Sequence, residues 1–85
     1  MPTFSKNRAK LLRLFLKKPD QSFYMQEIGR MLRKKPGTFQ RTLNNMVSEG
    51  ILHSEYKAHA RYFKINKKYQ LYSEVKSIVS KTLGI

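Results

Sequence analysis

The feature that most limits how this chain can fold is an interruption between two helical stretches, at Lys35-Pro36-Gly37. Apolar residues recur at helical spacing over Met25–Lys34 before the interruption and over Pro36–Glu49 after it. Pro36 ends the first stretch, yet it also fits the first position of a second helix, because its missing N–H would be unpaired there anyway. The sequence therefore predicts two consecutive helices joined by a tight turn.

The same helical spacing predicts a first and a last helix. Apolar residues recur over 4–17, with Ser5 as the candidate N-cap and Pro19 just beyond the end of the pattern. The helical pattern returns at Lys67 and continues until Gly84. We therefore expect one further helix before the tightly connected pair and one at the end of the chain.

Two β-strands are predicted between the third and the last helix. The segments Ile51–Lys57 and Ala60–Asn66 are rich in β-branched and aromatic residues and are separated by a very short connection, which is typical of a hairpin. Gly50 can adopt the left-handed conformation that stops the preceding helix. A shorter β-prone link, Ser22–Tyr24, precedes the second helix.

This order of elements predicts an α+β fold that is mostly α. It corresponds to a winged helix-turn-helix, with a three-helix core, a two-stranded β-hairpin wing and a C-terminal helix. The chain has 85 residues, of which 40% are hydrophobic, so it can form one compact core. We therefore interpret residues 1–85 as a single DNA-binding domain.

The charge of the chain indicates a polyanionic partner. Eighteen Lys and Arg residues stand against five Asp and Glu residues, which gives a net charge of +13. A surface this small does not need such an excess for solubility, so double-stranded DNA is the first candidate.

The residue types that support catalysis or metal binding are scarce. There is no cysteine, which excludes disulfides, thiolate metal sites and a catalytic thiol. The two histidines, His53 and His59, are separated along the predicted hairpin, and the five carboxylates are isolated. We predict no enzyme activity, no metal and no cofactor. No apolar stretch is long enough for a membrane span or a secretory signal, so we expect a soluble cytoplasmic protein.

The polar face of the third helix contains side chains that can read base edges. Arg pairs with two acceptors of guanine, and Asn or Gln pairs with the acceptor and donor of adenine. An ordinary solvated face is the alternative, but two adjacent Asn residues form helices poorly and have no capping role there. Residues near helix starts are candidates for holding phosphates, and the hairpin tip is a candidate for flanking contacts. The predicted DNA-contacting residues are Gln26, Lys34, Lys35, Thr38, Gln40, Arg41, Asn44, Asn45, Lys57, His59 and Arg61.

Arg61 has a second interpretation. It shares a strand face with Phe63 and Ile65, so its stem can instead pack at the base of the wing.

The first helix carries more apolar surface than one core requires. Its apolar side chains cover an arc of roughly 200°, and two faces are expected to be buried. Leu11 and Leu14 point partly away from the face of Leu12, Phe15 and Leu16. We therefore predict a homodimer through the first and last helices. The predicted interface residues are Leu11, Leu14, Val75, Ile78, Val79 and Leu83.

The first helix also carries a narrow basic line at helical spacing, with no acidic residue from Phe4 to Pro19. The line consists of Lys6, Lys10, Arg13 and Lys17. It can bind phosphate, but we interpret it as a solvated stripe, because the first helix of this architecture normally lies away from the major groove.

Three segments resemble the winged helix-turn-helix domains of the ArsR-like transcriptional regulators. They are Pro36–Leu43, Gly50–Leu52 and Arg61–Asn66. The sequence looks most similar to the branch found alone or ahead of minimal nucleotidyltransferase domains in bacteria and archaea. The resemblance implies a prokaryotic, dimeric DNA-binding fold and a nucleotidyltransferase or other protein as a further partner. It does not imply metal sensing, because the cysteines and clustered histidines of the metal-responsive members are absent.

The sequence leads us to expect a sequence-specific regulator of transcription, acting as a repressor, with its third helix in the major groove and no built-in small-molecule pocket. Two alternatives remain open. One is a protein-interaction or antitoxin-type regulatory module, and the other is a non-specific architectural protein that binds DNA or RNA. Selection from a random duplex pool separates them from the preferred reading.

Overall fold

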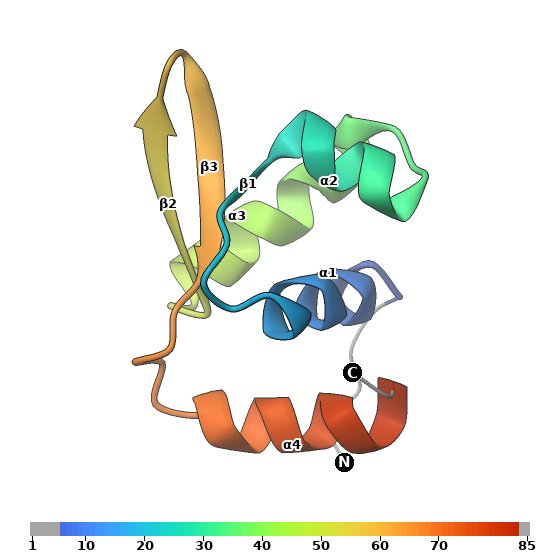
Figure 1. Cartoon of the computed structure of the whole chain (residues 1–85), viewed down its shortest axis with the longest axis vertical. Helices are drawn as coiled ribbons and strands as arrows, with labels where there is room; N and C mark the ends of the chain where they lie inside the picture. Colours follow the sequence, from blue (N-terminus) through green and yellow to red (C-terminus); the bar gives the residue numbers. More distant parts are fainter. Residues whose placement is uncertain (1–5, 84–85) are drawn as a thin grey trace.

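The computed structural model describes residues 6–83, with side chains described as far as residue 81. These residues form four α-helices, a short 3₁₀-helix and a small sheet. Figure 1 shows that the hairpin of the sheet projects from one end of the molecule. The elements are α1 (Lys6–Lys17), β1 (Phe23–Tyr24), α2 (Met25–Leu32), η1 (Pro36–Phe39), α3 (Gln40–Ser48), β2 (Leu52–Lys57), β3 (Ala60–Ile65) and α4 (Tyr72–Leu83). The predicted α+β winged helix-turn-helix is confirmed. The expected N-cap Ser5 and the terminal Gly84 lie outside the described residues.

The sheet has three strands in the order β1-β3-β2, so the wing is broader at its base than the predicted two-stranded hairpin. The β-prone link before α2 pairs with β3, placing Phe23 opposite Phe63 and Tyr24 opposite Tyr62. All strands are antiparallel. Phe23 and Phe63 are fully buried, so β1 fixes the base of the wing to the helical core.

The core is a single cluster that draws on every helix and on the base of the sheet. Its aromatic members interlock, and the rings of Phe15 and Phe23 meet edge to face at 5.6 Å. The buried residues are Leu11, Leu12, Leu14, Phe15, Leu16, Phe23, Ile28, Phe39, Leu43, Met46, Ile51, Leu52, Phe63, Ile65 and Val79.

Helix α1 lies between α4 and the rest of the domain, as Figure 1 shows. Leu11 is 0% exposed, Leu14 is 9% exposed and Val79 of α4 is 0% exposed within the one chain. The two apolar faces of α1 are therefore both buried within one chain, with α4 against one side of the helix and the rest of the domain against the other. The prediction that one chain leaves Leu11 and Leu14 uncovered is wrong, because local periodicity does not reveal which other elements pack against α1.

The tight turn after α2 depends on a close approach of the backbone to Gly29. The Lys34 N–H donates to the Gly29 carbonyl oxygen at 2.9 Å, and Arg33 adopts a left-handed conformation with φ 56°. A Cβ at residue 29 would lie 2.8 Å from the Lys34 carbonyl oxygen and 3.2 Å from the Pro36 ring. The left-handed Arg33 ends α2 at Leu32, two residues before the predicted end at Lys34.

The predicted third helix is divided into two parts. Pro36 is at the first position, as expected, but residues up to Phe39 form the 3₁₀-helix η1 and α3 begins at Gln40. The α3 helix ends where Gly50 takes φ 84°, which confirms the predicted left-handed stop. Helix α4 begins at Tyr72 and not at Lys67, because the intervening residues form turns anchored by Asn66. The Asn66 side-chain amide donates to the Gly50 carbonyl oxygen at 2.8 Å.

A bidentate ion pair connects α1 to the end of α3. The two terminal guanidinium nitrogens of Arg8 donate to the two carboxylate oxygens of Glu49 at 2.8 and 2.6 Å. The hydrogen bonds from Arg8, opposed in part by burial, hold the pKa of Glu49 below its ordinary value of 4.5. The pair therefore links α1 to the residue that follows α3.

Candidate nucleic-acid interface

The side of α3 that faces solvent is polar and basic. Arg41, Asn44 and Asn45 are exposed, whereas Leu43 and Met46 on the other side of the helix are buried in the core. Helix α3 contains no acidic residue. Its exposed face can therefore approach a polyanion and still present hydrogen-bond donors and acceptors.

The division of the predicted helix changes the position of two candidate residues. Thr38 belongs to η1, and its N–H donates to the Lys35 carbonyl oxygen at 3.0 Å. Gln40 is the first residue of α3. Both side chains are exposed, so they stand at the N-terminal end of α3 next to the tight turn.

Arg61 connects the wing to α3. One of its terminal nitrogens donates to Asn44 Oδ1 at 2.5 Å, and the other donates to Ser54 Oγ at 3.1 Å. Its guanidinium carbon also lies 4.8 Å from the centre of the Phe63 ring, a cation–π contact. Arg61 lies near the tip of the wing, opposite Tyr56, and not at its base; its guanidinium reaches Asn44, Ser54 and Phe63, and the side chain is half-buried.

The Arg61 contact restricts the chemistry of Asn44. Arg has only donors, so the carboxamide oxygen of Asn44 must face the guanidinium. The Asn44 amide nitrogen is the group left to face outward, and it is a donor. Sequence reasoning identified both residues but not this bond or the contribution of Ser54. The alternation of side chains along the strands could have indicated Ser54. Ser54 pairs with Phe63, and Arg61 is two residues from Phe63 on the same strand, so the side chains of Ser54 and Arg61 lie on the same face of the sheet.

The α2 helix and the turn form a basic hollow of about 500 Å³. It brings together three of the predicted contact residues, Gln26, Lys34 and Lys35, and adds Arg30 and Arg33. All five side chains are exposed. Four cations around one hollow can hold a phosphate group of a nucleic-acid backbone. Arg30 and Arg33 are not among the contact residues predicted from the sequence.

The tip of the wing is a strained turn. Ala58 and His59 both have positive φ, 49° and 66°, as in the type I′ turns that connect twisted strands. Such turns favour Asn and Gly, because these residues adopt positive φ at a low cost in free energy. His59 is exposed at the tip, far along the hairpin from His53 near its base.

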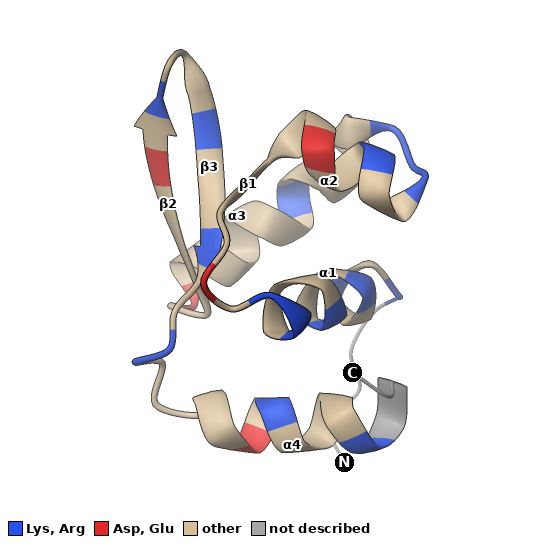
Figure 2. Ribbon diagram, viewed as in Figure 1, with Lys and Arg blue, Asp and Glu red and all other residues tan. Residues whose placement is uncertain are grey.

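The wing is less positive than its sequence indicates. Lys57 forms an exposed ion pair with Glu55 at 3.0 Å, and Lys67 at the foot of the wing pairs with Asp20. That contact with Lys67 holds the pKa of Asp20 below its usual range. Tyr56, 77% exposed, is an additional wing residue that sequence reasoning missed. Figure 2 shows basic residues on α1, on the turn after α2 and on the wing, where β2 also carries an acidic residue.

The described part of the chain shows neither a metal-binding cluster nor a membrane-spanning helix. Within residues 6–83, no three His, Asp or Glu side chains gather where they could hold a metal ion. None of the helices in the same part of the chain is long and apolar enough to cross a membrane.

No known protein-family profile matches the sequence, and no curated protein matches it closely. The fold, however, is similar to that of solved transcription regulators. The AntR antimony-specific transcriptional repressor matches 93% of this chain with a TM-score of 0.74 and 14% identity. A possible transcriptional regulator from Methanosarcina mazei matches 94% with a TM-score of 0.70 and 18% identity. A MarR family protein from Bacillus stearothermophilus matches 96% with a TM-score of 0.69 and 13% identity.

These likenesses cover 65%, 70% and 58% of the three solved chains, so this chain spans less than two thirds of two of them. They support the winged-helix fold of transcription regulators in general. They do not single out the ArsR-like branch suggested by the sequence, which stays a prediction.

Proposed function

We propose that this protein is a non-catalytic, sequence-specific DNA-binding regulator of transcription. In this proposal α3 enters the major groove, the basic hollow beside α2 holds one backbone phosphate, and the wing contacts the flanking backbone. The observation that carries the proposal is the exposed face of α3, where base-reading side chains stand without any acidic neighbour on the helix. The likeness of the fold to solved transcription regulators supports the same function.

The contact between Arg61 and Asn44 gives the proposal a specific chemistry. Because Arg61 occupies Asn44 Oδ1, Asn44 offers its amide nitrogen as a donor to a base edge. A donor without an acceptor beside it can bond any major-groove acceptor, such as purine N7, guanine O6 or thymine O4, but it cannot make the paired contact with the acceptor and donor of adenine. Arg61 therefore acts as a positioning residue for Asn44, and Arg41 is the residue best suited to bidentate pairing with guanine.

We further propose that the protein represses transcription as a homodimer in the cytoplasm. The buried Leu11 and Val79 are not available for such an interface, whereas Val75 and Ile78 of α4 keep part of their surface exposed. The Leu83 side chain, also predicted at this interface, lies outside the described part of the chain. A two-fold dimer would place two α3 helices about 34 Å apart, one turn of DNA, so its operator would be an inverted repeat.

Selection from a random duplex pool tests the proposed function. The expected result is an enriched motif with two-fold symmetry, bound with a steep dependence on salt that corresponds to about six to ten neutralised phosphates per dimer. Recovery of no motif would favour a non-specific architectural protein. Weak binding to any nucleic acid, with little dependence on salt, would favour a protein-interaction module.

A further inference from the structure

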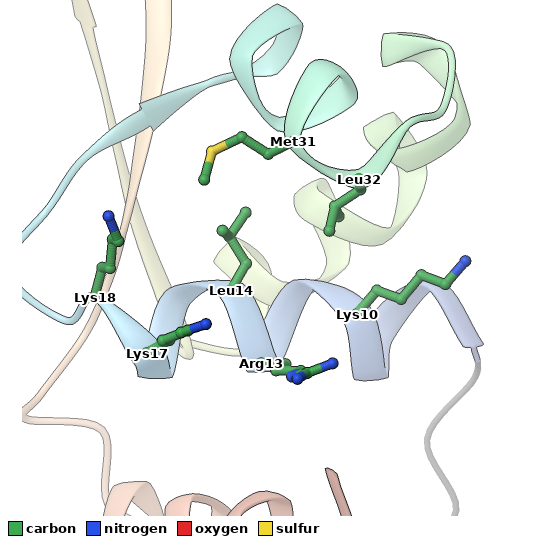
Figure 3. A pocket seen from close by; sticks show the side chains of 7 residues that line it. All are labelled: Lys10, Arg13, Leu14, Lys17, Lys18, Met31 and Leu32. Atoms are coloured by element: carbon green, nitrogen blue, oxygen red, sulfur yellow. The ribbon is translucent and has the colours of Figure 1, made fainter. Parts of the chain in front are cut away.

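A groove lies between α1 and α2, on a surface that the proposed DNA contacts do not use. It has a volume of about 350 Å³ and is lined by residues of α1, of the segment that follows α1, and of α2. In Figure 3, Leu14 projects from α1 towards α2, while Met31 and Leu32 project from α2 towards α1. No residue of α3 or of the wing lines the groove.

The floor of the groove is apolar. Leu14 is almost fully buried, Leu32 is half-buried and Met31 is 45% exposed. An exposed Met31 on a domain of this size leaves apolar surface in water. Because a methionine side chain is flexible, it can adapt to an apolar side chain of a partner.

The rim of the groove is cationic. Lys10, Arg13, Lys17 and Lys18 surround the floor, and all four are exposed. No carboxylate among the described residues forms an ion pair with any of them; the three ion pairs found involve Arg8, Lys57 and Lys67. The segment from Phe4 to Pro19 also contains no acidic residue. Three members of the basic line of α1, Lys10, Arg13 and Lys17, therefore border an apolar groove.

The spacing of the cations favours an extended ligand. Lys10, Arg13 and Lys17 follow one another at about one helical turn, roughly 5.4 Å along the helix axis. Carboxylates spaced one helical turn apart on a second helix could each form an ion pair with one of these cations. A small ligand with one carboxylate would leave most of the rim unpaired, and duplex DNA has no apolar side chain for the floor.

We propose that this groove binds an acidic, amphipathic helical segment of a partner protein. Apolar side chains of the segment would fill the floor formed by Leu14, Met31 and Leu32. Its carboxylates would pair with Lys10, Arg13 and Lys17 along the rim. The proposal does not depend on DNA binding, because the groove shares no residue with α3 or the wing.

A designed helical peptide tests this proposal. The probe carries one glutamate and one leucine per turn on the same side, and a companion peptide has glutamine in place of every glutamate. Binding is measured by fluorescence anisotropy at about 0.1 M salt, with amide NMR shifts locating the site. The expected result is binding of the acidic probe at α1 and α2, and binding of the glutamine peptide at least about tenfold weaker.

Matched variants separate the groove from general attraction to a basic protein. Arg13→Gln with Lys17→Gln should weaken the probe about tenfold, and Met31→Gln about fivefold without any change of charge. The control, Lys76→Gln with Lys81→Gln, removes the same charge from exposed positions of α4 and should change the affinity less than about twofold. All substituted side chains are exposed, and circular dichroism verifies that each variant is folded.

Three results would overturn the proposal. The first is an equal loss of affinity in the groove and control variants, which would indicate only general charge attraction. The second is equal binding of the acidic and glutamine peptides. The third is a short duplex DNA that binds at the same α1 and α2 amides and displaces the probe, which would make the groove a nucleic-acid contact.

Discussion

The turn after α2 and the tip of the wing are both short reversals of the chain that force non-glycine residues into positive φ. At the turn, Arg33 takes φ 56°, and at the tip Ala58 and His59 take 49° and 66°. Their surroundings differ: the turn is packed on the backbone of Gly29, whereas the tip extends into solvent. The turn after α2 is therefore fixed by tertiary contacts, whereas the strained backbone at the wing tip has few contacts that stabilise it.

This difference suggests separate roles. The rigid turn sets the angle between α2 and α3, so a change there should affect the whole domain. The tip has few contacts to lose, so its strain can be relieved locally.

The largest expected effect is that of Gly29→Ala. The new Cβ would lie 2.8 Å from the Lys34 carbonyl oxygen, so the turn must shift. Alanine adds about 1 kcal/mol of helix propensity, but the clash should outweigh it and leave a net destabilisation of about 1 to 3 kcal/mol. Urea denaturation measures this change.

Gly37→Ala is the matched control, because nothing lies within 4 Å of a Cβ built at that residue. It should change the free energy of unfolding by less than about 0.5 kcal/mol. Equal effects of the two substitutions would show that the backbone contact at Gly29 does not set the turn.

The contact between the wing and α3 gives the next effect. Arg61→Ala releases Asn44 Oδ1, so Asn44 regains both its donor and its acceptor. We expect a loss of about 1 to 3 kcal/mol in affinity for the selected operator and an altered base preference at the Asn44 position. Lys57→Ala, the control on the same wing, should weaken all duplexes alike. An unchanged base preference in Arg61→Ala would contradict the positioning role.

At the wing tip we predict a gain. Ala58→Asn with His59→Gly supplies residues that accept positive φ, and it should stabilise the protein by about 1 kcal/mol. Thermal unfolding measures the shift in Tm. If the double variant is no more stable than the natural chain, the tip is not strained and the contrast with the turn fails.

The smallest effect concerns the ion pair that joins α1 to α3. Arg8 lowers the pKa of Glu49, so the pair stabilises the fold above about pH 4.5, and this contribution is lost as the pH falls through the lower pKa of the folded state. Because Glu49 is largely solvent-exposed, Glu49→Gln should cost only about 0.5 to 1 kcal/mol near pH 6 and almost nothing near pH 3.

Glu74→Gln makes the same charge change on α4, away from Arg8, and serves as the control. Paired thermal scans across this pH range test the expectation. A cost for Glu49→Gln that stays constant from about pH 6 to about pH 3 would show that the ion pair with Arg8 is not its source.

The sequence predicted the order of the elements because each helix has a clear apolar period and the hairpin is rich in β-branched and aromatic residues. Pro36 at the first position of a helix and Gly50 in the left-handed conformation after a helix were both predicted, and both are confirmed. The 3₁₀ segment at Pro36–Phe39 escaped prediction, because over four residues its period is close to that of an α-helix.

Long-range packing escaped prediction for a different reason. Nothing local in α1 reveals that α4 covers it, so buried Leu11 was assigned to a dimer interface. The bond between Arg61 and Asn44 joins residues 17 positions apart and depends on how the wing lies against α3. Gly29 did offer a signal, since glycine inside a helix weakens it and often marks a close approach of another backbone.

The shared hydrogen bond of Asn44 and Arg61 also has an evolutionary consequence. If the orientation of Asn44 depends on a wing residue, a new base preference at that position cannot be reached freely by changing α3 alone. Substituting either residue first would leave the other without its partner. Variants of this domain with altered operators should therefore carry paired changes at positions 44 and 61, so that the wing and the recognition helix diverge together.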